Sequence, residues 1–518
     1  MNIGRIPAKY AMLDPTREAV IDVASERRLT FGELDARVRR LANGLTGELG
    51  LCKGDRVAVL AKNSIEYLET LYACARVGLI AQPLNWRLAA AALERILADG
   101  KPRALVTSAE YLPLASSLAE AAGHPQVLAF GDAADGSFEE LLARAPATEP
   151  ETAADIGGQD PCLILYTGGT TGESKGAVHS HDSLYMGMLN QTVAERIVAT
   201  DVYMLTGQMF HIPVALAMNY MAHGCPLVLI NFDARLALEV IEREKVSAFL
   251  GITTMLNWMM AVDGFENFDL SSLRNIQYGG GPMPANVVKA ALKAFPCTLI
   301  QGYGQTEGMT MTFLSQEDHA RAVAGEHPER LRSCGREGFV SSVRVVDPEG
   351  EAVPRDGTTH GEIIVRSEAN MQGYWRRPEL TEQTLRDGWL WTGDIATWDA
   401  EGYLTIVDRA KDMIISGGEN IYSTQVEDAL YRHPAVLEAA VIGIPDPEWG
   451  EAVKAVVVLK PGTEATEADI IATAREHLAS YQKPRSVDFV EALPKAPTGK
   501  ILKRELRERY WQDQERQV

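Results

Sequence analysis

The chain has 518 residues, of which 46% are hydrophobic and 23% are charged, and its formal net charge is −20. A chain of this length is expected to form two or more domains, and its composition is that of a globular protein. The negative charge argues against nucleic-acid binding, because nonspecific binding to a phosphate backbone needs a basic surface.

The N-terminus and the cysteines bear on where the protein works. Residues Met1–Thr16 hold no apolar stretch of signal-peptide length, and the chain has no run of about 18 apolar residues. The six cysteines are widely spaced, without a Cys-x-x-Cys pair. We therefore expect a cytoplasmic protein with no transmembrane segment and no structural zinc site.

From residue 56 to about residue 301, short apolar runs alternate with amphipathic stretches. The pattern predicts helices at Ile65–Val77 and Ala234–Glu244, and strands at Arg56–Ala61, Ala104–Val106, Pro226–Asn231, Ala248–Gly251 and Cys297–Gln301. Strands that alternate with helices predict parallel sheets with both faces covered. Ligands of such sheets bind beyond the carboxyl ends of the strands, where we expect two loops, Thr167–Gly176 and Gly302–Glu307.

The pattern changes after about residue 342. The short runs Val343–Val346, Glu362–Arg366 and Tyr403–Ile406 are separated by Gly, Pro and Asp, which predicts an antiparallel or barrel-like portion. A smaller α+β pattern follows residue 411, with helices near Gln425–Arg432 and Glu467–Leu478 and strands near Val436–Ile442 and Val453–Val458. We predict a large domain over 1–408, a hinge at 409–411 and a small domain over 412–518.

Residues 166–176 read Tyr-Thr-Gly-Gly-Thr-Thr-Gly-Glu-Ser-Lys-Gly and follow the apolar run Cys162–Leu165. Glycines let backbone amides approach a polyanion, hydroxyls donate to its oxygens, and a lysine neutralises its charge. The stretch predicts a phosphate-binding loop, although it lacks the spacing of kinase and GTPase P-loops. The alternative is a glycine-rich surface turn.

Three further motifs suggest chemistry. Gln301-Gly-Tyr-Gly-Gln-Thr-Glu307 follows a predicted strand, and its carboxylate suits a Mg²⁺ ion beside bound phosphates. Trp391-Thr-Gly-Asp394 offers an acceptor for ribose hydroxyls, and Pro497-Thr-Gly-Lys500 lies in a basic stretch with Lys495, Lys503 and Arg504. The alternatives are a strand-to-helix turn, a Gly-Asp turn and a solvated basic tail, respectively.

In this order and spacing, the motifs resemble the adenylate-forming superfamily of acyl-CoA synthetases, aryl-CoA ligases, adenylation domains and firefly-type luciferases. Phe210-His211, Gly279-Gly-Gly-Pro282 and Asp408-Arg-Ala-Lys-Asp412 extend the resemblance over nearly the whole chain. It is nearest to bacterial fatty-acyl-CoA and 4-coumarate-type ligases. The implied fold is α/β: a large N-terminal domain with parallel αβα sheets plus a small β-barrel-like portion, and a small mobile α+β C-terminal domain.

The resemblance implies an AMP-forming ligase that uses ATP, Mg²⁺ and CoA. The substrate carboxylate attacks the α-phosphate, pyrophosphate leaves, and the acyl-adenylate then acylates the CoA thiol. Lys500 would bridge the carboxylate and the α-phosphate, Thr306 would contact the α-phosphate, and Glu307 would hold Mg²⁺. The remaining ATP- and AMP-binding residues that the resemblance implies are Thr167, Gly168, Gly169, Thr170, Thr171, Gly172 and Lys175 for the phosphates, Gly280, Gly281, Tyr303 and Gly304 around adenine, and Asp394 and Arg409 for the ribose.

The resemblance also implies two conformations. After adenylation the small domain would rotate about Lys411, Lys500 would leave the site, and Ser416, Gly417 and Gly418 would reach the pantetheine of CoA. The alternative for this last segment is a plain hairpin turn. Several plant relatives carry a lysine where Ile415 stands, so any phosphate contact made there is absent.

His211 has two interpretations. A histidine after an aromatic residue is commonly a packed core residue, whereas in the resembling ligases this pair gates the acyl pocket and orients the carboxylate. Phe210-His211 argues against an amino-acid substrate, for which adenylation domains carry aspartate here. We expect the acyl pocket to include Phe210, His211, Gly279, Met309 and Met311, which suits an alkyl or aryl acid. His179 and His181 are expected only to lie near the first loop, where they could cap the following helix with Asp182.

Three other functions are weighed against the CoA ligase. A stand-alone acyl-adenylating enzyme would pass its product to a carrier protein, but no extra insertion of the fatty-acyl-AMP ligase kind is evident. A luciferase-like oxygenase would share every ATP motif. A nucleotide sensor is disfavoured because it would not need Lys500. The sequence leaves the oligomeric state open and is compatible with a homodimer.

Overall fold

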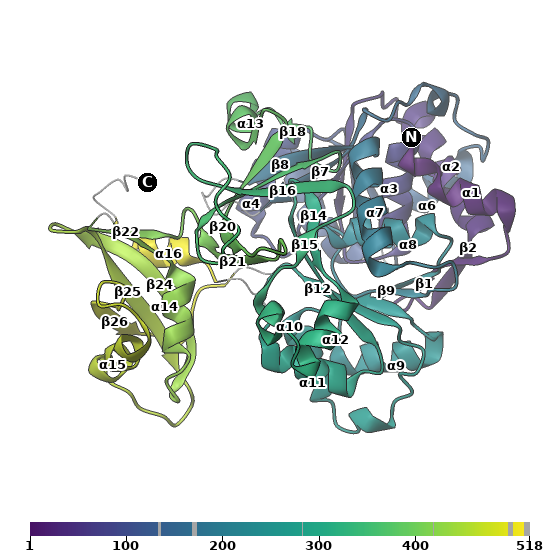
Figure 1. Ribbon diagram of the computed structural model, residues 1–518. Helices are drawn as coiled ribbons and strands as arrows, with labels where there is room; N and C mark the ends of the chain where they lie inside the picture. The colour runs from purple at the N-terminus through teal and green to yellow at the C-terminus, as the bar shows by residue number, and fades with distance from the viewer. Residues whose placement is uncertain (133–135, 168–173, 282, 418, 496–500, 512–518) are drawn as a thin grey trace. The chain divides into compact units, whose positions relative to one another are not determined.

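The computed structural model describes residues 1–132, 136–167, 174–281, 283–417, 419–495 and 501–511 (Figure 1). The chain divides into two compact units. The first is formed within Met1–Gly168, Ser174–Val343 and Val365–Leu390, and the second within Arg344–Ile364 and Trp391–Val518. This division assigns residues 344–364 and 391–408 to the same unit as the C-terminal part. The hinge at 409–411 stays a prediction.

A nine-stranded sheet in the first unit has the order β15-β14-β13-β12-β11-β9-β10-β1-β2. Its strands from β13 through β1 pair in parallel, whereas β2, β14 and β15 pair antiparallel at the two edges. The strands are β1 (Glu18–Asp22), β2 (Arg27–Thr30), β9 (Tyr203–Leu205), β10 (Leu227–Leu229), β11 (Ala248–Leu250), β12 (Asn275–Gly279), β13 (Thr298–Gln305), β14 (Met309–Leu314) and β15 (Arg336–Glu337).

A seven-stranded sheet in the same unit has the order β18-β8-β7-β4-β3-β5-β6. Its centre is again parallel, and β7, β8 and β18 form the antiparallel edge. The strands are β3 (Arg56–Leu60), β4 (Ile80–Pro83), β5 (Ala104–Ser108), β6 (Gln126–Phe130), β7 (Pro161–Thr167), β8 (Lys175–Ser180) and β18 (Gly373–Tyr374).

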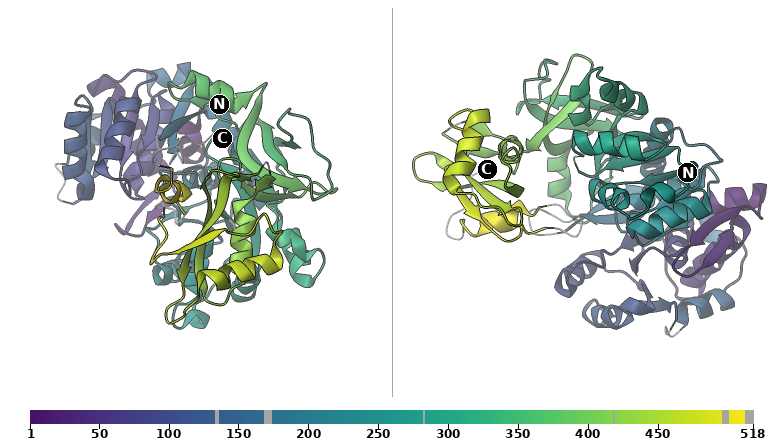
Figure 2. Two further views of the ribbon diagram at one scale, coloured as in Figure 1. Left: turned by 90° about the vertical axis from the view of Figure 1, so that its left-hand side faces the viewer. Right: turned by 90° about the horizontal axis from the view of Figure 1, so that it is seen from below.

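Helices cover the faces of these sheets (Figure 2). The α-helices of the first unit are α1 (Ile6–Leu13), α2 (Phe31–Asn43), α3 (Ile65–Arg76), α4 (Ala90–Gly100), α5 (Leu112–Ala121), α6 (Ser137–Arg144), α7 (His181–Glu195), α8 (Pro213–Ala222), α9 (Ala234–Glu244), α10 (Thr253–Met260), α11 (Ala285–Ala294), α12 (Gln316–Ala324) and α13 (Pro378–Thr384). None of the helices in the described residues is long and apolar enough to span a bilayer.

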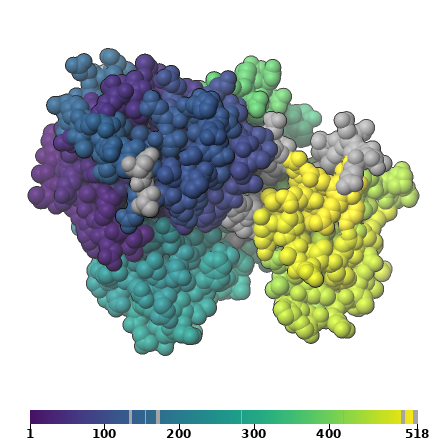
Figure 3. All heavy atoms as spheres, turned by 180° about the vertical axis from the view of Figure 1, so that it is seen from behind, coloured from purple at the N-terminus to yellow at the C-terminus, as the bar shows by residue number. Residues whose placement is uncertain are grey.

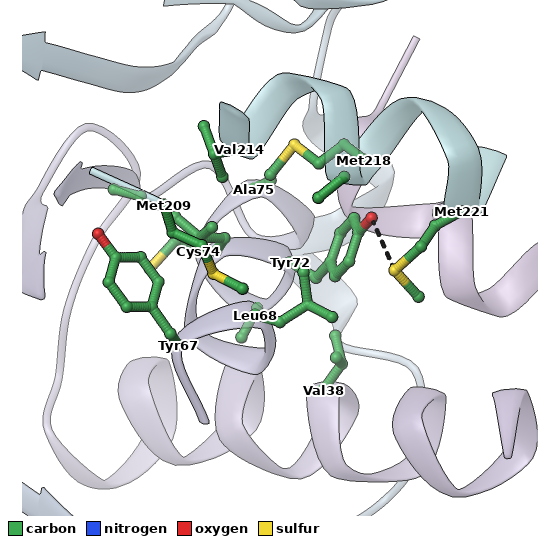
Figure 4. Close-up of a cluster of buried hydrophobic side chains, with 14 of the residues drawn as sticks. Val38, Tyr67, Leu68, Tyr72, Cys74, Ala75, Met209, Val214, Met218 and Met221 are labelled. Atoms are coloured by element: carbon green, nitrogen blue, oxygen red, sulfur yellow. Dashed lines mark hydrogen bonds between the residues drawn. The ribbon is translucent and has the colours of Figure 1, made fainter. Parts of the chain in front are cut away.

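Alternation along β3 shows how the layers are built. Val57 and Val59 pack into the largest core cluster, while Ala58 and Leu60 point to the other face, against α4 and α5. The largest cluster also contains residues of β9 and β10, so it lies between the two sheets. Figure 4 shows part of it, where Tyr72 of α3 donates a 3.6 Å hydrogen bond to the sulfur of Met221. In Figure 3 the purple and blue residues of the first unit adjoin its teal residues.

Residues 341–409 contribute a smaller, five-stranded sheet with the order β16-β17-β20-β19, in which β21 also pairs with β20. Its pairs β19–β20 and β20–β21 are antiparallel, which the Gly-, Pro- and Asp-separated runs predicted. The strands are β16 (Ser341–Val346), β17 (Gly361–Ser367), β19 (Leu385–Arg386), β20 (Trp389–Trp398) and β21 (Leu404–Arg409).

The C-terminal part of the second unit is an α+β layer structure. Val441 and Val453 belong to a cluster with helices α14 and α15, and Ile442 and Val456 belong to another with α16. Its elements are α14 (Ser423–Leu430), α15 (Glu467–His477), α16 (Lys503–Glu508), β22 (Ile414–Ser416), β23 (Glu419–Ile421), β24 (Val436–Asp446), β25 (Gly450–Leu459) and β26 (Ser486–Phe489). The predicted α/β fold class, with a large N-terminal and a small C-terminal portion, is confirmed.

One predicted loop is wrong. Residues Gly302–Gln305 do not form a loop after a strand but continue β13, which turns back as a hairpin with β14. The small glycines make this pairing possible, because a Cβ at Gly304 would lie 1.8 Å from the carbonyl oxygen of Met309. The alternative of a strand-to-helix turn is therefore wrong as well.

Candidate active site

The first loop joins β7 to β8. Thr167, the last residue of β7, pairs with Lys175, the first residue of β8, so the two side chains lie at the mouth of an antiparallel hairpin. The predicted phosphate-binding residues Gly168, Gly169, Thr170, Thr171 and Gly172 lie outside the described residues.

Tyr374 connects Lys175 to Glu307. The ammonium nitrogen of Lys175 lies 5.4 Å from the centroid of the Tyr374 ring, and the Tyr374 hydroxyl donates a 2.7 Å hydrogen bond to Oε1 of Glu307. Burial, together with the Glu307 carboxylate, raises the pKa of Tyr374. The Glu307 side chain is nearly enclosed, and the residue is 9% exposed. A cation, a phenol and a carboxylate from three distant segments thus meet in one place.

Pairing of β18 with β8 creates this arrangement. Tyr374 lies opposite Ala177, and the backbone N–H of Trp375 donates to the carbonyl of Gly176 at 2.7 Å. The N–H of Met371 donates to the carbonyl of Glu307 at 2.7 Å. The segment 371–375 therefore holds both motifs in register.

His179 supports the backbone beside Glu307. Its Nε2 donates a 2.8 Å hydrogen bond to the carbonyl of Thr306, and Nδ1 lies 3.2 Å from the Ser183 hydroxyl. The following helix is capped by Ser180, whose side chain accepts from the Ser183 N–H. The expectation that His179, His181 and Asp182 form this cap is therefore wrong, since a short serine side chain at the N-cap reaches the third helical N–H.

Burial lowers the pKa of His179 from 6.5 to about 4. The unfolded chain therefore binds this proton more readily, and the contribution of neutral His179 to stability is lost as the pH falls from about 6.5 to about 4. His179→Gln, which keeps a donor for the Thr306 carbonyl, should remove about 2 kcal/mol of the stability that is lost between pH 8 and pH 5. Urea unfolding of both proteins at pH 8 and pH 5 measures it.

The pH dependence of the wild-type protein must be compared with that of His179→Gln, because buried carboxyl groups change the stability with pH in the opposite direction. Burial raises the pKa of Glu69 and of Glu195 to about 7, so acidification through this range stabilises the fold. An unchanged pH dependence in His179→Gln would contradict the assignment.

Three glycines lie at the end of β12: Gly279 is its last residue, and Gly280 and Gly281 follow. Gly279 is in register with Gly302, and a Cβ at Gly279 would lie 2.3 Å from the Gly302 carbonyl oxygen. Gly280 has a φ of +75°, and a Cβ at Gly281 would meet no atom of a described residue within 4 Å. Gly279 is therefore required for backbone packing, whereas Gly281 borders open space next to the strand that carries Tyr303.

This contrast predicts different effects of two alanine substitutions. Gly279→Ala should lower the free energy of unfolding by about 3 kcal/mol, because a fixed carbonyl occupies the space for the methyl group. Gly281→Ala should change it by less than about 1 kcal/mol and, if this residue borders adenine, should raise the KM for ATP. Urea unfolding measures the stability of both variants, and ATP titration measures their KM for ATP. Equal stabilities of the two variants would contradict the prediction.

A narrow pocket lies beside Met309. Its lining includes Gly187, Met188 and Gln191 of α7, Leu216 of α8, and Met309 and Thr310 of β14. Met309 adopts a φ of +56° and packs on Gly187, where a Cβ would lie 3.1 Å from the Met309 Cγ. Of the predicted acyl-pocket residues, Met309 lines this pocket, whereas Phe210, His211, Gly279 and Met311 do not.

His211 lies in a separate aromatic group. Its ring centroid is 4.6 Å from that of Phe210, and Phe210 packs edge-on against Trp86 at 6.3 Å. The buried Nε2 of His211 makes no hydrogen bond to a described residue. Burial, with a smaller effect of the Arg87 charge, lowers the pKa of His211 to about 4. The imidazole is therefore neutral at pH 7, with one nitrogen available to a ligand.

In the second unit, β20 and β21 bring Asp394 and Arg409 together. Their side chains form an ion pair of 3.0 Å between residues that are directly opposite in the two strands. Ser416 pairs with Glu419 in the β22–β23 hairpin, and the N–H of Gly417 donates to the Trp449 carbonyl at 2.8 Å. Gly418 and Lys500 lie outside the described residues.

Two profile matches cover most of the chain. Residues 8–375 match the family described as AMP-binding enzyme, and residues 425–500 match the AMP-binding enzyme C-terminal domain. The chain belongs to the AMP-binding enzyme family. The resemblance to the adenylate-forming superfamily is thereby confirmed.

Relatives of this AMP-binding enzyme match it over their whole length. It is 38% identical to a feruloyl-CoA synthase from Amycolatopsis sp, over 98% of this chain and 99% of the relative. It is 36% identical to the long-chain-fatty-acid–CoA ligase FadD13 of Mycobacterium tuberculosis, over 98% of both chains. The ATP-bound structure of MatB from Rhodopseudomonas palustris superposes with a TM-score of 0.87 at 30% identity, over 99% of both chains.

Sequence reasoning missed two features of this AMP-binding enzyme. Tyr374 was not predicted, because nothing in Gly373-Tyr374-Trp375 indicates a partner 67 residues away. In the basic C-terminal stretch, the side chains of Lys495 and Arg504 are 40% and 41% exposed, as in a solvated tail, whereas that of Lys503 is only 12% exposed. Lys503 forms a 2.7 Å ion pair with the half-buried Glu427, and Arg507 pairs with Asp412 at 2.9 Å and donates to the Lys411 carbonyl at 3.0 Å.

Proposed function

We propose that the protein is an ATP-dependent carboxylic acid–CoA ligase that forms an acyl-adenylate and then an acyl-CoA thioester. The observation that carries the proposal is the convergence of Lys175, Tyr374 and Glu307 on the mouth of the β7–β8 hairpin. The names of the full-length relatives support the reaction class. A medium- or long-chain fatty acid or an aryl acid is the proposed substrate.

In the first half-reaction, a carboxylate oxygen forms a bond to the α-phosphorus of ATP and the bond to pyrophosphate breaks. Both reactants are anions, so the site must neutralise charge and align them. Thr167, Lys175 and the loop between them would hold the β- and γ-phosphates. Thr306 would contact the α-phosphate, with its backbone fixed by the hydrogen bond from His179.

The carboxylate of Glu307 fits the expected Mg²⁺ ion. Tyr374 occupies Oε1, and no described residue donates to Oε2. A single carboxylate is sufficient, because Mg²⁺ keeps water and phosphate oxygens as its other ligands. When bound, the ion would reduce the negative charge of the phosphates.

Two groups of residues are proposed to contact the nucleoside. The adenine ring is proposed to lie beside Gly280, Gly281, Tyr303 and Gly304. The ribose is proposed to lie beside Asp394 and Arg409. An arginine that is ion-paired to an aspartate holds the carboxylate in a fixed orientation, which would suit Asp394 for accepting hydrogen bonds from the two ribose hydroxyls.

The second half-reaction needs a different set of residues. The CoA sulfur forms a bond to the acyl carbon, and AMP leaves with the bonding electron pair. We propose that rotation about Lys411 withdraws Lys500 and brings Ser416–Gly418 to the pantetheine. The acyl site is proposed to be shaped by Phe210, His211, Gly279, Met309 and Met311. In this site the neutral His211 would orient the substrate carboxylate.

Two finer properties stay predictions. A cytoplasmic location is testable by cell fractionation, and a homodimer by sedimentation of the purified protein. Transfer of the acyl group to a carrier protein remains the alternative function, followed by a luciferase-like oxygenase.

The reaction is tested with purified protein, ATP, Mg²⁺ and a panel of alkanoic, aryl and arylpropenoic acids, with and without CoA. AMP and an acyl-CoA, identified by mass spectrometry for one subset of acids, are the expected products. Acyl-AMP that persists when CoA is present would overturn the ligase proposal in favour of the carrier-protein or oxygenase alternatives.

A further inference from the structure

One wall of the pocket beside Met309 carries a polar side chain in apolar surroundings. Gln191 of α7 lines the pocket next to Met188, Leu216 and Met309 and is 5% exposed. The pocket holds about 10 Å³, roughly the space of one water molecule. Methionines border it on two sides, and their flexible side chains can rearrange to admit a larger group.

The amide nitrogen of Gln191 is already used. Nε2 donates to Oε1 of Glu195, one helical turn further along α7, and lies 3.4 Å from Oε1 of Gln277. Because this end of the Gln191 amide is the nitrogen, its other end is the oxygen. Gln191 lines the pocket, and its amide oxygen accepts no hydrogen bond from any residue the structure describes.

Glu195 holds Gln191 in this orientation. The carboxylate is completely buried and also accepts from the Tyr220 hydroxyl at 2.6 Å and from Nε2 of Gln277 at 3.2 Å. Gln277 in turn donates to the Tyr203 hydroxyl at 3.3 Å. The network thus satisfies Glu195 and leaves the Gln191 oxygen as an acceptor without a partner among the described residues.

We propose that Gln191 recognises a hydroxyl group on the acyl part of the acid substrate, and that Glu195 is its positioning residue. The inference rests on the proposed function, because it narrows the class of acid that the ligase activates. A hydroxyl donor would satisfy the Gln191 oxygen, whereas a plain hydrocarbon would bury this oxygen without a partner. A phenol and an aliphatic alcohol can both donate this hydrogen bond to the Gln191 oxygen.

Two matched pairs of acids distinguish these sources: 4-hydroxycinnamic against cinnamic acid, and 12-hydroxydodecanoic against dodecanoic acid. We expect the hydroxylated member of one pair to have a kcat/KM at least about tenfold higher, measured by AMP release. The pair that shows the preference identifies the source. Equal kcat/KM values within both pairs would overturn the inference.

Substitution of Gln191 tests the residue. In Gln191→Leu the preference for the hydroxylated acid should fall to about one, mainly through a higher KM for that acid. Met188→Leu is the matched control, because Met188 lines the same pocket but has no amide that could bind a hydroxyl group. This variant should change kcat/KM equally for both acids of a pair. A preference that persists in Gln191→Leu would overturn the assignment.

A binding measurement keeps the inference testable if Gln191→Leu does not fold or if no acid is turned over. Calorimetry of the wild-type protein with 5′-O-(N-acylsulfamoyl)adenosines carrying 4-hydroxycinnamoyl, cinnamoyl, 12-hydroxydodecanoyl or dodecanoyl groups needs no reaction. Tighter binding of a hydroxylated analogue than of its match supports the inference even if the proposed CoA ligation fails. Equal affinities within both pairs overturn the inference about Gln191. The ligase proposal would still stand if AMP and an acyl-CoA are formed.

Discussion

Replacing Lys500 with alanine is expected to lower the rate of adenylation by about 10²- to 10³-fold. The substrate carboxylate and the α-phosphate repel each other, and an ammonium between them would stabilise the charge that develops in the transition state. The second half-reaction should be retained, because the proposed rotation removes Lys500 before CoA attacks.

The two half-reactions are measured separately, by ATP–pyrophosphate exchange and by thioester formation from a supplied acyl-adenylate. Lys495→Ala is the matched control, because Lys495 lies in the same basic stretch but forms an ion pair with Glu438. It should retain both half-reactions. Loss of both in Lys500→Ala, or full adenylation, would contradict the proposed role.

Contacts of residues that follow Lys500 in the sequence fasten residues 501–511 to the second unit. Lys503 is bound to Glu427 and to the Ser423 hydroxyl, and Arg507 is bound to Asp412 and the Lys411 carbonyl. The same contacts fasten α16 to the residues around the proposed hinge. A rotation at Lys411 would therefore carry residues 501–511 as part of the unit.

Regular elements could be predicted from local pattern. The helix at Ala234–Glu244 has the predicted bounds, because its apolar residues repeat on one face and the chain on either side does not continue the pattern. Hydrophobic runs such as β3 and β5 were predicted for the same reason. In each case the information lies within a few residues of the element itself.

Pairing between distant strands could not be predicted in this way. Gly302–Gln305 was assigned to a loop because glycine is rare in strands, yet the segment is held by β12 and β14 on its two sides. The chemical types at the site were recognisable in Lys175 and Glu307. Their connection through Tyr374 was not, because it depends on the pairing of β18 with β8.

Replacing Glu307 with glutamine is expected to lower the adenylation rate by about 10²- to 10³-fold, because a neutral amide is a poor ligand for Mg²⁺. Glutamine has the size of glutamate, and its carbonyl oxygen can still accept from Tyr374, so the fold should be retained. The Mg²⁺ concentration needed for half-maximal rate should rise. Exchange assays over a Mg²⁺ series, with thermal melting as a folding check, measure both effects.

Tyr374→Phe separates the metal from the hydrogen bond. This variant keeps the Glu307 carboxylate and the aromatic ring under Lys175 but removes the hydroxyl that orients Oε1. Loss of one hydrogen bond to a charged group corresponds to about 1.5–3 kcal/mol, so the rate should fall by about 10- to 100-fold, less than in Glu307→Gln. If the adenylation rate falls equally in Tyr374→Phe and Glu307→Gln, the position of the Glu307 carboxylate accounts for the loss in both variants. An unchanged Mg²⁺ requirement in Glu307→Gln would remove Glu307 from the metal site, and the tyrosine contact would then be structural.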